Sequence, residues 1–96
     1  MDVSDIQQVT VIGAGSMGHG IAEVAAMAGY DVVLRDIEEE LVQDGYDDIE
    51  WSLGKLAEKG FLDEDPETVM ARIDTAVDLD DSVAEADLVV EAAPEQ

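Results

Sequence analysis

The chain lacks cysteine, has a single histidine, and carries four basic residues against 25 acidic ones. Without cysteine, disulfides and thiolate metal sites are excluded, and no His, Asp and Glu set has the spacing of a zinc site, so we expect no bound metal. The scarcity of Lys and Arg disfavours nucleic acid and anionic membranes as partners. The apolar runs are too short to span a membrane, and the acidic N-terminus does not resemble a signal peptide. We therefore expect a cytoplasmic protein.

The acidic excess gives a formal net charge of −21. At low salt such a charge strongly repels itself, whereas molar salt shortens the Debye length to about 3 Å and removes most of the repulsion. Disorder is disfavoured because 47% of the residues are hydrophobic, and they occur in periodic blocks. The composition therefore favours a halophilic, haloarchaeal type of protein. An acidic interaction surface is the alternative, although the acids are dispersed along the whole chain.

Residues 9–36, VTVIGAGSMGHGIAEVAAMAGYDVVLRD, carry the most informative motif. An apolar strand, a G-x-G-x-x-G turn, an apolar helix, a second strand and an acid follow one another, which is the complete dinucleotide fingerprint. In this motif Gly13 permits the tight turn, Gly15 lets a pyrophosphate approach the backbone, and Gly18 lets the helix pack closely. The helix that starts near Ser16 would direct free N–H groups and its positive dipole end at the phosphates.

Asp36 indicates which dinucleotide is bound. A carboxylate at the end of the second strand accepts hydrogen bonds from both ribose hydroxyls and repels a 2′-phosphate. The residues after it are Ile37 and three glutamates, without the arginine typical of NADP sites, and strand alternation turns Arg35 to the opposite face. NAD is therefore favoured over NADP, with FAD left open because flavoproteins share this motif.

Periodicity predicts an α/β domain over residues 1–96. We expect strands at 7–12, 31–35, 73–77 and 88–92 and helices at 16–28, 38–59, 66–70 and 80–86. Right-handed crossovers then predict a partial doubly wound Rossmann fold with a parallel sheet of order 3-2-1-4 and a long helical excursion between strands two and three. The apolar residues expected to face the core are Met17, Ile21, Val24, Ala25 and Ala28 of the first helix and Leu41, Ile49, Leu53 and Leu56 of the long one.

The last predicted strand, 88–92, would be a bare apolar edge if nothing followed it. We therefore expect the chain to be the N-terminal fragment of a longer protein.

Three segments resemble the N-terminal part of L-3-hydroxyacyl-CoA dehydrogenases: VIGAGSMGHGIAEVAAMAGYDVVLRDI, the long-helix segment WSLGKLAEKG, and DLVVEAAPEQ. They span nearly all of residues 9–96 but about the first third of a family member. The resemblance implies NAD-dependent oxidation of 3-hydroxyacyl-CoA to 3-ketoacyl-CoA in fatty-acid β-oxidation, by a full-length protein that is a homodimer. The family's catalytic histidine and glutamate lie beyond residue 96, so we expect no catalytic residue here and an inactive fragment.

The resemblance also implies residue roles. Gly13, Gly15, Ser16, Met17 and Gly18 would surround the pyrophosphate, and Asp36 would hold the adenine ribose. The candidates for the nicotinamide side are Ala92, Ala93 and Glu95, although Pro94 departs from the aliphatic residue often found there. The candidates for contact with CoA are Ser52, Lys55 and Lys59.

Alternatives remain open at several of these residues. Lys55 and Lys59 lie one turn apart on one helix face, where salt bridges with Glu58 or nearby acids are the simpler explanation. His19 is expected near the adenosine half of the cofactor and without a catalytic role. For the whole chain, the competing functions are the N-terminus of another nicotinamide hydroxyacid dehydrogenase and a free-standing NAD sensor module.

Overall fold

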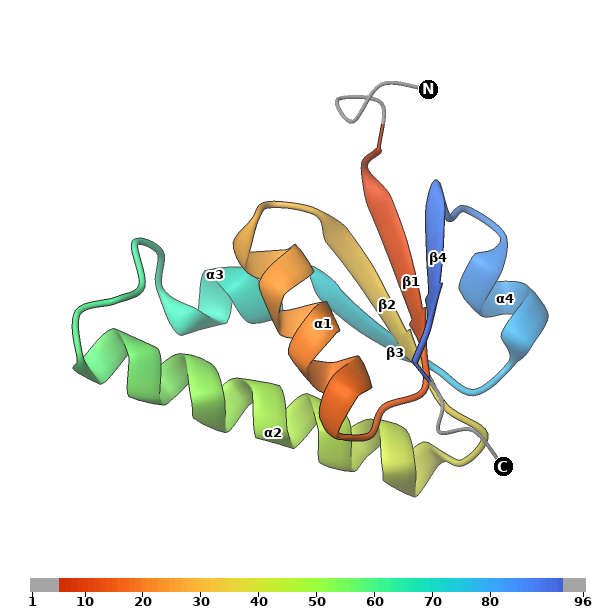
Figure 1. Cartoon of the computed structure of the whole chain (residues 1–96), viewed down its shortest axis with the longest axis horizontal. Coiled ribbons are helices and arrows are strands. Elements are labelled where there is room, and N and C mark those ends of the chain that lie inside the picture. Colours follow the sequence, from red (N-terminus) through yellow and green to blue (C-terminus); the bar gives the residue numbers. More distant parts are fainter. Residues whose placement is uncertain (1–5, 93–96) are drawn as a thin grey trace.

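Four parallel strands form one sheet, in the order β3-β2-β1-β4 (Figure 1). In the computed structural model, which describes residues 6–92, they are β1 (Gln8–Ile12), β2 (Asp31–Arg35), β3 (Ile73–Ala76) and β4 (Leu88–Glu91). Val11 of β1 pairs with Leu34 on one side and with Val90 on the other. The predicted strand order 3-2-1-4 is confirmed, and every strand boundary lies within one residue of its prediction.

Four helices connect the strands: α1 (Ser16–Met27), α2 (Glu39–Glu58), α3 (Pro66–Met70) and α4 (Leu79–Val83). The first three pack on one another, and α4 packs against β2 and β3. The Thr10 hydroxyl donates to the carbonyl oxygen of Ser82 in α4, whereas its strand neighbours Val9 and Val11 point to the other face. Helices α1 and α4 therefore cover opposite faces of the sheet. The short helix expected at 80–86 begins one residue earlier and ends three residues earlier than predicted.

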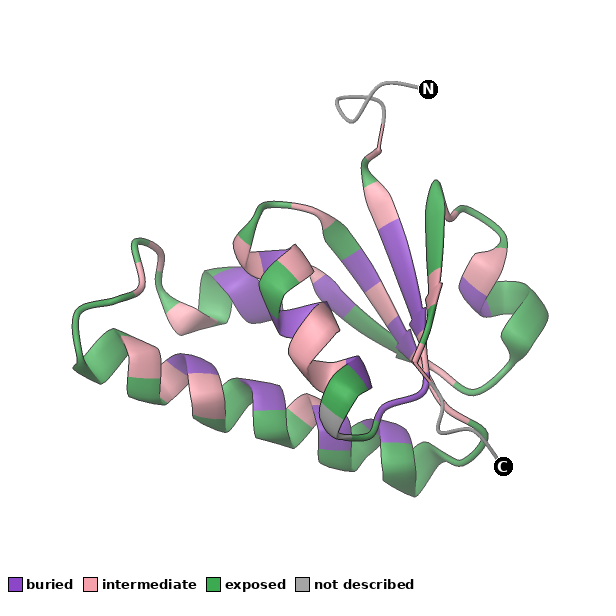
Figure 2. Ribbon diagram, viewed as in Figure 1, coloured by how far each residue is buried: buried purple, intermediate pink, exposed green. Residues whose placement is uncertain are grey.

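The core lies between the sheet and the layer formed by α1, α2 and α3 (Figure 2). Ala22 and Ala26 are the fully buried apolar residues of α1, whereas Met17 and Val24 are each 67% exposed. The predicted inner face of α1 is therefore wrong in part. The apolar stripe of α1 is broader than its contact with the sheet and α2, so its small residues occupy the contact and its larger ones lie beside it.

The inner face of α2 also differs from its prediction. Ile49 and Leu53 are buried as expected, but Val42 and Gly45 complete the buried face, while Leu41 is 41% exposed. The reason is the close approach of α2 to the β1–α1 turn, where a glycine allows contact that a leucine would prevent.

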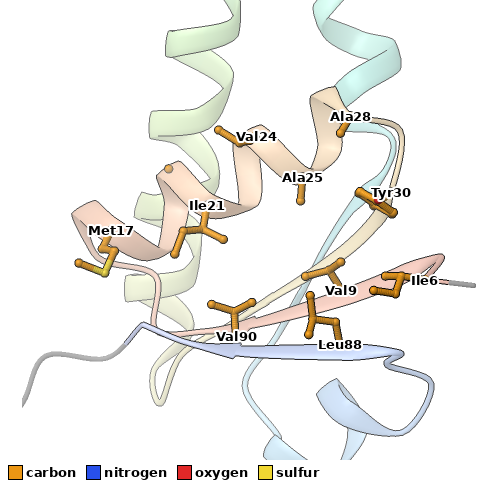
Figure 3. Close-up of a pocket in the computed structure, with 11 residues that line it drawn as sticks. Ile6, Val9, Met17, Ile21, Val24, Ala25, Ala28, Tyr30, Leu88 and Val90 are labelled. Atoms are coloured by element: carbon orange, nitrogen blue, oxygen red, sulfur yellow. The ribbon is translucent and has the colours of Figure 1, made fainter. Parts of the chain in front are cut away.

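An apolar hollow of about 730 Å³ opens between α1 and the strands β1 and β4 (Figure 3). Met17, Ile21 and Val24 line it from α1, and Val9, Leu88 and Val90 line it from the strands. Parallel sheets are normally covered on both faces, whereas among the described residues this hollow leaves the apolar side chains of Met17, Val24 and Leu88 exposed. Among the described residues, no helix is both long and apolar enough to cross a lipid bilayer.

Candidate functional site

The turn between β1 and α1 is held by its own backbone. Gly13 has φ +106°, in the left-handed region that favours glycine. Its N–H donates to the carbonyl oxygen of Arg35 at 2.7 Å, which fixes the turn to the end of β2. The chain then enters α1 through Gly15, which has an extended conformation. The first N–H groups of α1 have no intrahelical acceptor and remain available for an anion.

Gly18 is required for packing within the chain. A Cβ at Gly18 would lie 1.5 Å from the carbonyl oxygen of Gly13 and 2.6 Å from its carbon. No movement of a flexible side chain relieves such a contact, because both atoms belong to the backbone. The close helix packing predicted for this glycine is therefore confirmed.

No contact within the described part of the chain requires a glycine at position 15. Its φ of −67° and ψ of −167° are open to any residue, and a Cβ there would meet no protein atom within 4 Å. The missing side chain leaves exposed space beside the free N–H groups of α1. The open position therefore leaves room for a phosphate-sized ligand to approach the backbone at the start of α1.

Asp36 stands at the end of β2 and is bound to the turn. One carboxylate oxygen accepts from the N–H of Ala14 at 2.8 Å, and the other accepts from the N–H of Ile37 at 2.7 Å. Sequence reasoning missed this bond to the turn, because hydrogen bonds between segments 22 residues apart leave no local pattern. A carboxylate has about four acceptor positions, so both oxygens can still accept a ribose hydroxyl.

A second hollow, of about 420 Å³, lies between the turn and α2. It is lined by Ala14, Gly15, His19, Asp36, Leu41, Asp44, Gly45 and Asp48. A Cβ at Gly45 would lie 2.8 Å from the carbonyl oxygen of Ala14, so α2 crosses directly against the turn. The contribution of α2 to this wall was not predicted from the sequence.

Arg35 lies away from this hollow. Its Nε donates to the carbonyl oxygen of Val77 at 2.9 Å, beyond the end of β3. The lining of the hollow includes neither Arg nor Lys among the described residues. This arrangement agrees with the expectation that Arg35 is not placed to bind a 2′-phosphate.

On the other side of the turn, β4 ends beside α1. The N–H of Ala92 donates to the carbonyl oxygen of Ile12 at 2.8 Å, and a Cβ at Gly18 would lie 3.7 Å from the Cβ of Ala92. Met17 is exposed in the first turn of α1. The side chain of Ser16 and the predicted site residues Ala93 and Glu95 lie outside the described part of the chain.

The candidates for CoA contact lie toward the C-terminal end of α2. The Ser52 hydroxyl donates to the buried Glu23 carboxylate at 2.7 Å and so joins α2 to α1. Lys55 Nζ lies 3.5 Å from a Glu58 oxygen and 5.6 Å from the centre of the Trp51 ring. The predicted pairing with Glu58 is therefore present, between two exposed side chains of the kind that add little stability. Lys59 is exposed at the end of the helix.

Comparison with known proteins agrees with this geometry. Residues 8–96 match the family model described as "3-hydroxyacyl-CoA dehydrogenase, NAD binding domain". A probable 3-hydroxybutyryl-CoA dehydrogenase from Deinococcus radiodurans is 56% identical over 85 residues, which are 88% of this chain and 30% of that protein. Human mitochondrial hydroxyacyl-coenzyme A dehydrogenase is 44% identical over 96 residues, covering 94% of this chain and 31% of the relative.

Solved structures of dehydrogenases are also similar to this chain. The crystal structure of (S)-3-hydroxybutyryl-CoA dehydrogenase from Ralstonia eutropha has a TM-score of 0.88 at 40% identity, over 95% of this chain and 32% of that one. Lactate dehydrogenase from Cryptosporidium parvum, solved with lactic acid and nicotinamide adenine dinucleotide, has a TM-score of 0.63 at 25% identity, over 94% of this chain and 25% of that one.

The chain thus spans about 30% of the length of the curated relatives it matches. Within that span the match includes the glycine turn, Asp36, the long α2 excursion and β4. The chain belongs to the family of 3-hydroxyacyl-CoA dehydrogenase NAD-binding domains.

Proposed function

We propose that this chain is the NAD-binding part of an enzyme that oxidises 3-hydroxyacyl-CoA to 3-ketoacyl-CoA, with NAD as the hydride acceptor. The observation that carries the proposal is Gly15, whose missing Cβ opens space for a phosphate beside the start of α1. The family match supports the reaction and the cofactor. The dinucleotide-bound lactate dehydrogenase, which has the same fold, supports NAD in particular.

The proposed cofactor contacts follow the path of the turn. Gly13, Gly15, Ser16, Met17 and Gly18 would surround the pyrophosphate. Asp36 would accept hydrogen bonds from the adenine ribose with the acceptor positions that Ala14 and Ile37 leave free. Ala92, Ala93 and Glu95 would line the nicotinamide side.

The proposed CoA contacts are Ser52, Lys55 and Lys59. Of the four basic residues of the chain, Arg35 donates to the carbonyl oxygen of Val77, Arg72 pairs with the part-buried Glu64, and Lys55 pairs with the exposed Glu58. The two lysines on α2 are exposed, so they are the cations best placed to meet a CoA phosphate. Ser52 would take part through its acceptor positions, since its proton is directed at Glu23.

We further propose that the active enzyme is longer than this chain and that its following segment covers the apolar hollow between α1 and β4. The hollow is lined by exposed Met17, Val24 and Leu88, and the matched relatives are about three times as long. A chain of residues 1–96 alone would bind NAD but lack turnover.

The acidic surface supports a further proposal, that the protein is adapted to high salt. The acids of α2 illustrate the point, since Glu39, Glu40, Asp47 and Glu50 are all exposed to solvent. The cytoplasmic location, the homodimer, and the absence of nucleic acid or membrane partners remain predictions from the sequence.

The reaction is tested by following NADH formation from 3-hydroxybutyryl-CoA and NAD in molar KCl. The assay compares this chain with the product of the complete reading frame that contains it. The proposal predicts turnover by the longer protein and none by residues 1–96. Turnover by residues 1–96 alone would contradict the inactive-fragment proposal, and a reading frame that stops after Gln96 would favour a free-standing NAD module.

A further inference from the structure

Three carboxylates from two elements line the open hollow beside the glycine turn, and Asp44 and Asp48 are exposed to solvent. Asp36 comes from the end of β2, and Asp44 and Asp48 come from α2. The positions Leu41, Asp44, Gly45 and Asp48 share one helix face because they are three, four and seven residues apart. Within the described part of the chain, the only other ionisable group in the lining is His19.

The position of this acidic face is fixed by the backbone. Gly45 lies between Asp44 and Asp48 on that face, and its own backbone is pressed against Ala14 of the turn, leaving no room for a Cβ. The helix therefore cannot withdraw from the hollow without losing the α2–turn contact. Asp47, one residue away, is directed differently: it accepts from the Gln43 amide at 2.9 Å and does not line the hollow.

This hollow adjoins the proposed cofactor site. It shares Gly15, with its open Cβ position, and Asp36, with its free acceptor positions, with the proposed adenosine side of NAD. A phosphate added to the 2′-oxygen of that ribose would bring a charge of about −1.5 to −2 at neutral pH into a space bounded by three carboxylates.

We propose that Asp44 and Asp48 are specificity-determining residues that reject NADPH, together with Asp36. The inference rests on the proposed function, because it requires the adenine ribose at Asp36. It goes further than the sequence pattern, which assigns the discrimination to Asp36 alone. The repulsion from each exposed helix carboxylate corresponds to a factor of roughly two to three in affinity for NADPH at about 0.2 M salt.

The test is a fluorescence titration of NADH and of NADPH into the folded chain, in about 0.2 M and about 2 M KCl. The variants are the double substitution Asp44→Asn with Asp48→Asn, and Asp47→Asn as the matched control on the same helix. Each substitution removes negative charge from a strongly acidic chain, so the variants should fold at least as well as the parent. Circular dichroism at both salt concentrations verifies this.

At the lower salt, the double variant should bind NADPH about fivefold more tightly than the parent chain, with a much smaller change for NADH. Asp47→Asn should change neither affinity by more than about twofold. At the higher salt the gain in NADPH affinity should largely disappear, because screening already removes the repulsion. A merely structural role of Asp44 and Asp48 would move both cofactors together and would not depend on salt in this way.

Two outcomes would overturn the inference, and they are distinguishable. A double variant that behaves like Asp47→Asn, in a chain that binds NADH, would contradict the role of Asp44 and Asp48 and leave the cofactor site intact. A parent chain that is folded but binds neither dinucleotide would contradict the proposed site itself, and the inference with it.

Discussion

One motif contains Gly13, Gly15 and Gly18, and the physical surroundings of the three glycines differ. Gly13 needs a positive φ, Gly18 has the Gly13 carbonyl where its Cβ would be, and Gly15 has open space. The sequence motif predicts a different role for each glycine, and the structure gives the physical reason for Gly13 and Gly18 and leaves space for the proposed ligand at Gly15. Substitution of each glycine should therefore have a different effect.

We expect Gly15→Ala to preserve folding and to abolish most NADH binding, since the added methyl group meets ligand and no protein atom. Gly18→Ala should disrupt the turn and lower the free energy of unfolding by several kcal/mol, because its contacts are backbone atoms. Urea unfolding and NADH titration of both variants provide the check. A Gly15→Ala chain that binds NADH normally would contradict the assignment of its open space to the phosphate.

The charged carboxylate of Asp87 contributes to the stability of the fold. Its carboxylate accepts from the N–H groups of Gln7 and Gln8 at 2.9 and 3.0 Å, which ties the start of β4 to β1. These backbone hydrogen bonds lower the pKa of Asp87 below its ordinary value. A depressed pKa in the folded state gives stability that is present above the ordinary value, near 4, and is lost as the pH falls through the folded-state value.

Asp87→Asn should therefore lower the urea midpoint at pH 7, and the difference from the parent chain should shrink as the pH falls below about 4. Measurements in molar KCl keep the general repulsion between acids small. A difference that grows toward acid pH would show that the carboxylate form is not the stabilising one.

At the level of elements, α2 contains two glycines whose substitution by alanine should change the free energy of unfolding in opposite directions. Gly45 faces the turn, with the Ala14 carbonyl oxygen 2.8 Å and the Ala14 Cβ 3.1 Å from its Cβ position, whereas Gly54 has no atom within 4 Å. Gly45→Ala should lower the free energy of unfolding by about 1–3 kcal/mol. Gly54→Ala should raise it by up to about 1 kcal/mol, because alanine is the better helix former.

Urea unfolding of the two variants at one salt concentration tests this contrast on a single helix. Gly45→Ala should also weaken NADH binding, since it pushes α2 away from the hollow. Equal stability changes in the two variants would mean that α2 does not approach the turn as the structure shows.

Sequence periodicity was sufficient for the elements and their order, because parallel strands with apolar runs and right-handed crossovers leave few arrangements. It could not tell which apolar face of α1 is covered: Val24 and Ala22 both fit the helical repeat, yet Val24 is exposed and Ala22 is buried. It also could not show that Asp36 binds Ala14, or that Asp44 and Asp48 line the hollow beside the turn. Those facts depend on how α2 crosses the turn, which is a tertiary contact.

At the scale of the whole molecule, the acidic excess leads us to expect a stability that depends on salt. With 25 acidic and four basic residues, the described salt bridges, Lys55 with Glu58 and Arg72 with Glu64, neutralise little of the negative charge. We expect the urea midpoint to rise steadily from dilute buffer to about 2 M KCl as screening reduces the repulsion. Circular dichroism measures this, and a midpoint that does not depend on KCl would contradict the proposed adaptation to salt.

The most direct measurement is calorimetric titration of NADH into the chain and into its Asp36→Ala variant, in about 2 M KCl. We expect one NADH per parent chain and a loss of at least about tenfold in affinity for the variant, which lacks the charged acceptor of the ribose hydroxyls. A folded parent chain that binds no NADH, or an Asp36→Ala variant that binds it as tightly as the parent, would contradict the proposed cofactor site.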